Sequence, residues 1–494
     1  MPSPPRWLLV AAGFAIFAIV ATANSAGYRY GASDQAFYLP AAARVLDPAL
    51  FPHDAALLDT QAWLTAADEI LAVAFRTGRA IGLHAPAVVA IAYLGSLLFL
   101  YLAALAFGRA LDGSLWTGAA LAAMLALRHA VPYSGVNTLE AYFHPRLVVF
   151  AAGVLGLAWM MRGRIWQALT LTAVSMLLHP TTALWFLIWI GVAVAISHPP
   201  ARRPLAICAA VAMVLAAWAV TSGPLNGRLV RMDPEWLAAI GAKDYLFPDR
   251  WPAYAWLVNL AYPLLIGVLL SVRRRSGQLT RMQLGIGLGA IILFLIFLAS
   301  LPYNAERIAL VVQLQVPRIF WMLDFFATAL IVSWLVQRTK PRAVAVTSAI
   351  ALAAVLRGLY IMTIEFPERP LVPLDLPDDD WKDAMRWARA TPTGTHWLVH
   401  PGHTYRYGSS VRIAADRDVF HEEVKDAAVA MYDRQVAARV LERATAIGDF
   451  SALDALRARD LAARYDLDYL VTESRHLDLP GVYANARFVI YDLR

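Results

Sequence analysis

The chain has 494 residues, of which 59% are hydrophobic and only 16% are charged, and its mean hydropathy is +0.53. Soluble globular proteins carry about 25% charged residues, so the composition excludes an ordinary soluble enzyme. The net charge of +7 does not indicate nucleic-acid binding, because the arginines lie in short connections between apolar runs, where they set membrane orientation. The single cysteine, Cys208, excludes an intrachain disulfide and metal sites built on cysteine.

Long apolar runs recur along the first three quarters of the chain, and a spanning helix needs roughly 20 mostly apolar residues. The first run follows Arg6 and ends in small residues, as a signal peptide does. Because many spans follow, we interpret it as an uncleaved first span. The runs predict about eleven spans, at residues 7–24, 84–107, 115–128, 146–161, 165–178, 181–197, 204–222, 252–271, 282–301, 318–337 and 341–361.

Alternate connections between the predicted spans are basic. They contain Arg109, Arg162 with Arg164, Arg202 with Arg203, and the segments 273–281 and 337–342. All of them fall on one side if the N-terminus is cytoplasmic, as the positive-inside rule requires. An odd number of spans then places the C-terminal segment outside the cell membrane, together with the longer connections 25–83, 129–145, 223–251 and 302–317.

The connection at 25–83 is too polar to span, yet it has helical periodicity. "DQAFYLPAAARVL" and "AWLTAADEILAVAFRTG" place apolar residues at three- and four-residue spacing, which is typical of helices lying along a membrane interface. Two spans can be joined by a much shorter loop. The length of this one suggests a site covered by surface helices at the outer leaflet.

Two stretches of this connection carry candidate site residues. In "SDQAFYLP", Asp34 and Tyr38 are spaced to share one helical face. Ser33 or Asp34 could instead cap the helix that follows. In "FPHDAAL", His53 and Asp54 follow a proline, and by themselves they mark a helix start.

Two predicted spans open with proline followed by arginine, at Arg146 and Arg318. Proline suits the first helical position, whereas a cation in the first turn opposes the helix dipole by about 0.3–1 kcal/mol. An anion bound between the two arginines would explain this repeated choice; snorkelling of arginine to lipid headgroups is the alternative. Asp324 is the one acid predicted inside a span, with Arg318 or His179 as its expected partner.

Other polar residues complete the outer set. They are Glu140, Tyr142, His144, His179, Glu306 and Arg307. The inner connections show mainly arginines. This asymmetry predicts a site that faces outward near the membrane surface, whereas a transporter would place polar residues and broken helices near the midplane.

The proline-rich segment 366–377 reads as a linker, and residues 378–494 mix amphipathic helices with short strands such as "HWLVH", "DYLVT" and "RFVIYDL". This pattern predicts a small α/β domain. The spacing of its histidines His400, His403 and His421 matches no common zinc site. Arg406 and Arg412 lie in the same loop, which either contacts a substrate or serves as a structural cover.

The chain resembles the GT-C superfamily of membrane glycosyltransferases. These enzymes use polyprenyl-phosphate-linked sugars and carry an essential acid in the first extracytoplasmic loop. "SDQAFYLP" resembles the family's Asp-Glu-x-x-Tyr-type motif, with Gln35 where many members have a second acid. "FPHD", "EAYFHPR", "LLHP", "YDLDYLV" and "VYANARFVIYDL" are similar to uncharacterised bacterial multi-pass membrane proteins.

The resemblance implies a polytopic α-helical membrane protein of about eleven spans, N-in and C-out, with a C-terminal extracytoplasmic α/β domain in a bacterial inner membrane. The implied domains are a GT-C-like transmembrane domain at 1–365, which includes the loop 25–83, the linker 366–377 and the α/β domain 378–494. The implied activity is inverting transfer of a sugar from a polyprenyl-phosphate donor to a glycan, lipid or protein acceptor at the outer face.

In this scheme Asp34 is the catalytic base that takes the acceptor proton, and Arg146, Arg318 and His179 stabilise the departing phosphate. The full set of predicted substrate-binding residues is Gln35, Tyr38, His53, Asp54, Glu140, His144, Arg146, His179, Arg307 and Arg318. No metal ligand and no cofactor are assigned, although a divalent cation at Asp34, Asp54 or Glu140 is left open.

The sequence lacks a Gly-rich phosphate loop and a His-Glu-x-x-His motif, which argues against nucleotide-sugar chemistry and metalloproteolysis. Two other interpretations stay open. One is a non-catalytic relative that binds a lipid-linked glycan, which Gln35 favours; the other is a transporter or flippase of such intermediates, which a deep polar path would favour.

Overall fold

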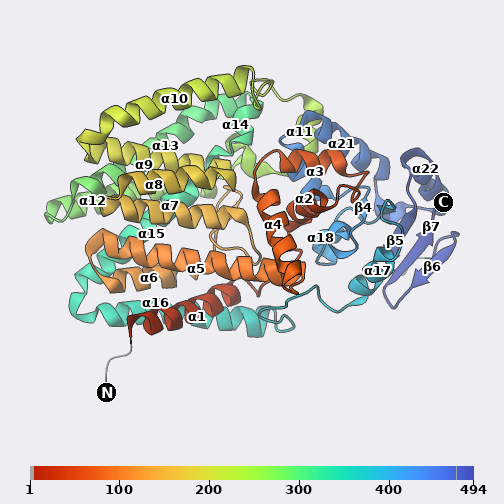
Figure 1. Ribbon diagram of the computed structural model, residues 1–494, viewed down its shortest axis with the longest axis horizontal. Coiled ribbons are helices and arrows are strands. Elements are labelled where there is room, and N and C mark those ends of the chain that lie inside the picture. Colours follow the sequence, from red (N-terminus) through yellow and green to blue (C-terminus); the bar gives the residue numbers. More distant parts are fainter. Residues whose placement is uncertain (1–4, 474–475) are drawn as a thin grey trace. The chain divides into compact units, whose positions relative to one another are not determined.

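The computed structural model describes residues 5–473 and 476–494, which are mostly helical (Figure 1). The chain forms two compact units. The first consists of the residues up to Tyr28, Ala92–Met232 and Lys243–Val372. The second consists of Arg29–Ile91, Asp233–Ala242 and Pro373–Arg494.

The first unit is built from apolar helices. Within residues 5–473 and 476–494, eight helical segments are long and apolar enough to cross a membrane, and three shorter apolar helices accompany them. These helices fall where the sequence predicts spans, and they indicate a multi-pass membrane protein. They are α1 (Arg6–Asn24), α5 (Ala85–Asp112), α6 (Leu115–Leu125), α7 (Pro145–Met161), α8 (Ile165–Val174), α9 (Pro180–Ser197), α10 (Arg202–Thr221), α12 (Ala253–Arg275), α13 (Arg281–Ala305), α15 (Ile319–Arg338) and α16 (Ala343–Tyr360).

Helix α15 forms the centre of the first unit, because nearly every residue of its first half is buried. The Trp321 ring stacks on Phe150 of α7, with centroids 3.9 Å apart. Helices α9 and α13 approach closely at Gly285, where an added Cβ would lie 2.6 Å from the carbonyl oxygen of Ala193. Small residues at such crossings let membrane helices pack by contact of their backbones. By contrast, α10 has no buried residue along its described length, Arg202–Thr221.

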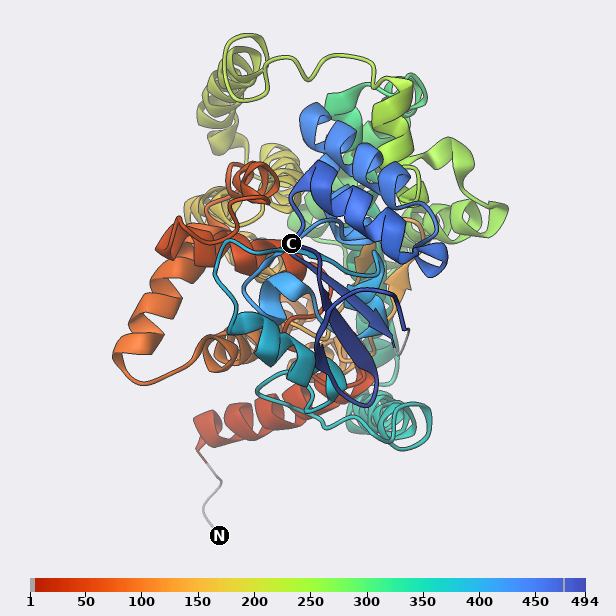
Figure 2. The same ribbon diagram turned by 90° about the vertical axis from the view of Figure 1, so that its right-hand side faces the viewer.

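The second unit contains a five-stranded mixed sheet, whose strands nearest the C-terminus are dark blue in Figure 2. The strand order is β4 (Asp418–Val419), β3 (His396–Leu398), β5 (Tyr469–Glu473), β7 (Phe488–Asp492) and β6 (Gly481–Ala484). Strand β3 runs parallel to β4 and β5, whereas β7 runs antiparallel to β5 and β6. The predicted strand segments form β3, β5 and β7, so the expected C-terminal sheet is confirmed.

Both faces of this sheet are covered, because successive side chains of a strand point to opposite faces. Trp397 and Val471 belong to the core on one face, and Leu398 and Leu470 to the core on the other. Residues of α17 (Asp380–Arg389) and α19 (Val411–Ala414) belong to the first core, and residues of α21 (Arg434–Ile447) and α22 (Ala455–Tyr465) belong to the second. The C-terminal segment also contains α18 (His403–Arg406) and α20 (Glu423–Ala430).

The first long connection packs in the second unit. Its helices are α2 (Gln35–Leu46), α3 (Ala55–Ala62) and α4 (Ala67–Ala80), and the short helix α11 (Pro234–Ala239) joins the same unit. The sequence alone assigns 25–83 to the membrane domain. The structure groups Arg29–Ile91 with Pro373–Arg494, because buried ion pairs and apolar contacts join these distant segments.

Candidate functional site

Five predicted site residues of the first unit gather at the starts of its helices, and we call them the first-unit polar cluster. Its members are Glu140, His144, Arg146, His179 and Arg318. Two helices begin alike: Pro145 and Pro180 occupy a first-turn position, and the preceding histidine caps the helix. The positive ends of helix dipoles therefore meet basic side chains here.

The imidazole of His179 caps α9, because its Nδ1 accepts a hydrogen bond from the Thr182 amide at 3.4 Å. Its Nε2 lies 3.4 Å from Nη1 of Arg318. Burial and the nearby Arg318 guanidinium lower the pKa of His179 well below its ordinary value, so the ring is neutral at pH 7. A neutral ring whose Nδ1 accepts carries its proton on Nε2. Nε2–H and Arg318 Nη1 are then two donors 3.4 Å apart, and an anion that contacted both would accept a hydrogen bond from each.

Arg146 lies in the first turn of α7 and contacts the one carboxylate of the cluster. Its Nη2 is 2.6 Å from Oε1 of Glu140, and both side chains are buried. Asn137 donates to the other oxygen of Glu140 at 3.2 Å. The His144 ring lies next to the His179 ring, with centroids 6.1 Å apart. Among the five residues of the cluster, Arg146 and Arg318 carry guanidinium groups and Glu140 carries a carboxylate.

Two other residues flagged by the sequence lie in different contacts of the first unit. Arg307 binds Asp249 through both terminal nitrogens, at 2.8 and 2.6 Å. Asp324 accepts from Nε2 of His129 at 3.1 Å. The prediction that Arg318 or His179 is the partner of Asp324 is therefore wrong. The hydrogen bond to Asp324 also raises the pKa of His129 above its ordinary value.

Asp34 lies in the second unit, directly before α2, and its side chain makes no capping hydrogen bond to that helix. The capping role considered for Asp34 is therefore wrong. Its Oδ1 instead pairs with Nζ of Lys425 at 2.9 Å, and the same ammonium donates to Ser33 Oγ at 2.9 Å. Gln35 is buried and accepts a hydrogen bond from the Gly31 amide at 2.7 Å. Tyr38 is buried and packs edge-on against Phe37.

Lys425, on α20, is the residue that the sequence does not point to. Its side chain is only 5% exposed, and its ammonium lies 5.2 Å from the centroid of the Tyr405 ring. Burial by itself lowers the pKa of Lys425, but Asp34 and Tyr405 outweigh burial and raise it above its ordinary value. The ammonium therefore stays charged beside the Asp34 carboxyl group. The sequence around Lys425 is that of an ordinary amphipathic helix, so it does not identify Lys425 as a site residue.

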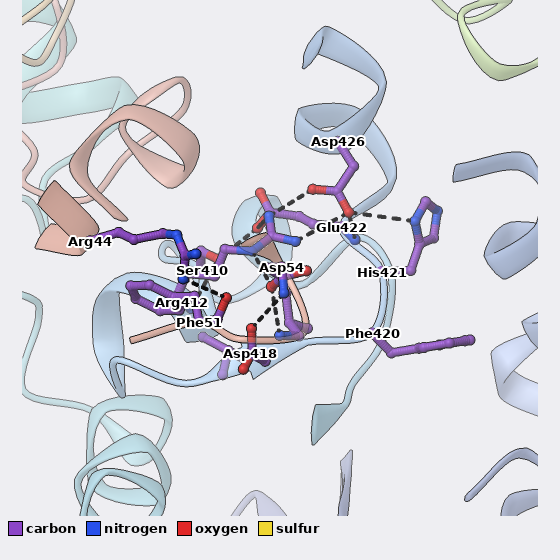
Figure 3. A network of polar contacts seen from close by, with 12 residues as sticks. Arg44, Phe51, Asp54, Ser410, Arg412, Asp418, Phe420, His421, Glu422 and Asp426 are labelled. Carbon is purple, nitrogen blue, oxygen red and sulfur yellow. Dashed lines mark hydrogen bonds and ion pairs between the residues drawn. The ribbon is translucent and has the colours of Figure 1, made fainter. Parts of the chain in front are cut away.

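Asp54 belongs to a second group of charges, which we call the second-unit charge network (Figure 3). The network consists of Asp54, Arg412, Asp418, Glu422, Asp426 and Arg439. The guanidinium of Arg412 is fully buried; its Nε is 2.8 Å from Asp54 Oδ2 and its Nη1 is 2.6 Å from Asp426 Oδ1. Arg439 also pairs with Asp54. These contacts join the start of α3 to the C-terminal segment.

The carboxylates of this network differ in pKa because of their neighbours. Burial raises the pKa of Asp54, but Arg412 and Arg439 outweigh it and hold the pKa well below its ordinary range. Burial and the charge of Asp54 together raise the pKa of Asp418 to about 7. Asp418 Oδ1 accepts from the Asp54 amide at 2.8 Å. The contacts of Asp54 are thus those of a structural ion pair.

Histidines of the second unit are held in packed positions. His53 stacks on His396, with ring centroids 4.4 Å apart. His403 is buried, and burial lowers its pKa to about 3. Across residues 5–473 and 476–494, no group of three or more His, Cys, Asp or Glu side chains is arranged to hold a metal ion.

Comparison with known proteins gives a likeness of fold only. No family model matches the chain, and no curated protein matches it. The structure is similar to the Archaeoglobus fulgidus oligosaccharyltransferase in complex with zinc and sulfate, with a TM-score of 0.47 and 12% identity over 93% of this chain and 68% of that chain. The apo form of the same protein gives a TM-score of 0.39 and 12% identity over 94% of this chain and 69% of that chain.

Proposed function

We propose that the protein is a membrane glycosyltransferase of GT-C type, and that its first-unit polar cluster binds the phosphate of a polyprenyl-phosphate-linked sugar. The observation that carries this proposal is the pair of donors at His179 Nε2 and Arg318 Nη1, which lie 3.4 Å apart in a partly buried setting. An oxygen of a phosphate between them would accept from both, and charge-assisted hydrogen bonds of this kind are among the strongest in proteins.

Asp34 is the proposed base of the transfer. An acceptor hydroxyl attacks the anomeric carbon, the bond from that carbon to the phosphate oxygen breaks, and Asp34 takes the hydroxyl proton. A base must be ionised before it can act, and the Lys425 ammonium at 2.9 Å favours the ionised form. The departing phosphate gains negative charge, which Arg318 and Arg146 stabilise. Inversion at the sugar carbon and an outward-facing reaction are parts of the same proposal.

A transporter is the weaker candidate because the polar groups on α15 are separated by a long apolar stretch. Asp324 contacts His129 near one end of this helix, and Ser333 contacts Asp112 at 2.7 Å toward the other end. The residues between them include Phe325, Phe326, Ala327, Ala329, Leu330 and Val332, all apolar and buried. The one polar residue of this stretch, Thr328, is only half-buried, so the fully buried side chains between Asp324 and Ser333 are all apolar.

The non-catalytic alternative starts from Gln35, which stands where many GT-C proteins have an acid. In this protein its carbonyl oxygen closes the turn before α2 by accepting from Gly31. The missing second acid leaves Asp34 as the one carboxylate of the motif. Binding of a phosphate donor without transfer would support this alternative, so the two functions are separated by activity.

Donor binding tests the proposal directly. We expect purified protein in detergent to bind farnesyl phosphate, used as a short polyprenyl phosphate, and Arg318→Gln to weaken binding by about 10- to 100-fold, because a hydrogen bond to a charged group contributes about 1.5–3 kcal/mol. Isothermal titration would measure both. Arg231→Gln, an exposed arginine of the same unit, is the matched control and should bind normally. Equal affinity of the wild type for farnesyl phosphate and farnesol would contradict a phosphate site.

A further inference from the structure

Helix α4 of the second unit has two apolar faces, and only one of them is buried. Leu71, Ala72 and Phe75 face the interior of the unit. Ile70 is 49% exposed and Val73 is 60% exposed, although both are large and apolar. A helix that covers a soluble core normally turns polar residues to its other side, so the outer face of α4 is unusual.

The exposed apolar residues continue beyond α4 in both directions. Ile70, Val73 and Ile81 follow helical spacing and share one side with the polar residue Thr77. Ile81, just after the helix, is 70% exposed, and Trp63, between α3 and α4, is 86% exposed. Singly exposed apolar residues are common on proteins, whereas a contiguous patch marks an interaction surface. We call Trp63, Ile70, Val73 and Ile81 the α4 patch.

The charges on α4 and the short link from α4 to α5 indicate what covers the α4 patch. Arg76 and Arg79 are exposed on the same helix, to the side of the apolar stripe, as in helices that lie on anionic membranes. The chain passes from α4 to α5 through residues 81–84 alone, and α5 is an apolar helix of 28 residues that is long enough to cross a membrane. The end of α4 is thus tied to the start of a predicted span.

We propose that α4 lies on the membrane surface, with the α4 patch inserted at the level of the lipid headgroups and Arg76 and Arg79 in contact with anionic lipid phosphates. Tryptophan suits this depth because its ring is amphipathic. A helix of this type buries its apolar face roughly 5–10 Å into the boundary between headgroups and acyl chains. This inference is independent of the proposed transfer reaction.

Site-directed spin labelling of the full-length protein in lipid nanodiscs tests the proposal. Cys208 is the single native cysteine, so a Cys208→Ser background allows one label at Val73→Cys. Glu442→Cys, at an exposed position of the same unit, is the matched control. We expect the label at position 73 to be more accessible to oxygen than to a water-soluble nickel chelate, and the label at position 442 to show the reverse.

A second arm tests the lipid charge. In nanodiscs that contain phosphatidylglycerol, the label at position 73 should be better protected from the chelate than in pure phosphatidylcholine. Arg76→Gln with Arg79→Gln should remove this difference. Equal chelate access at positions 73 and 442 in both lipids would overturn the proposal. Spin–spin broadening that disappears on dilution with unlabelled protein would also overturn it, because a second copy of the chain would then cover the patch.

Discussion

At the scale of single residues, the second unit shows how neighbouring charges give two buried acids, Asp54 and Asp418, different pKa values. Asp54 lies against Arg412 and Arg439, and these cations keep the pKa of its carboxyl group well below its ordinary range. Asp418 is also buried, and burial together with the charge of Asp54 raises its pKa to about 7. Burial therefore stabilises the network only where a guanidinium accompanies the carboxylate.

The raised pKa of Asp418 predicts that ionisation of this buried carboxyl group lowers the stability of the fold. A carboxyl group with a pKa of about 7 in the fold and an ordinary value near 3.8 binds its proton more tightly in the folded state, so stability falls as pH rises from about 4 to 7. Asp418→Asn removes this cost. We expect the variant to be more stable at pH 8, by on the order of 2 kcal/mol, and the gain to disappear near pH 4.

Thermal melting followed by tryptophan fluorescence at several pH values would measure the gain. Asp460→Asn, at an exposed position of the same unit, should leave the melting temperature unchanged throughout. A melting curve of Asp418→Asn that matches the wild type at pH 8 would show that Asp418 is not held protonated near neutral pH.

The sequence identifies some of these residues and misses others for a physical reason. Arg318 stands out because a cation in the first turn of a helix opposes the helix dipole, and Asp34 stands out because "SDQAFYLP" resembles a family motif. Lys425 does not stand out, because its partner Asp34 is 391 positions away. Arg412 is flagged only as a loop residue. A buried ion pair between remote segments leaves no local pattern in either one.

At the scale of elements, the apolar runs and the C-terminal strands are predicted well, because both follow from periodicity. Helix starts are predicted in part: Pro145 does open α7, but Pro317 and Arg318 belong to a short 3-10 turn (Val316–Arg318) that precedes α15. The packing of α2, α3 and α4 is not predicted, because it depends on the charge network rather than on their own sequences.

The charge network is expected to hold α3 in the second unit. Arg412→Met would leave Asp426 and Asp54 without the buried guanidinium that they share, and breaking a buried pair in this way costs about 3–5 kcal/mol. We expect a large fall in melting temperature and faster cleavage within residues 47–66 by a protease. Arg406→Met removes an arginine of the same loop whose side chain is half exposed and bound to Glu473. If both variants melt alike, the network does not have this structural role.

At the scale of the whole molecule, the apolar helices define a multi-pass membrane protein with a C-terminal sheet. The donor pair at His179 and Arg318 belongs to the first unit, and the Asp34–Lys425 pair belongs to the second. The sequence likewise points to two separate groups of residues, one around Arg318 and one around Asp34.

Sugar transfer by the purified protein in lipid nanodiscs tests the central claim most directly, with a panel of polyprenyl-phosphate sugars as donors and cell-envelope glycans and lipids as acceptors. We predict transfer by the wild type and by Asp47→Asn, an exposed acid at the other end of α2, and loss of at least 100-fold in rate for Asp34→Asn, because a positioned base contributes roughly 10²–10⁴-fold. Donor binding without transfer by the wild type, or full activity of a folded Asp34→Asn variant, would contradict the account.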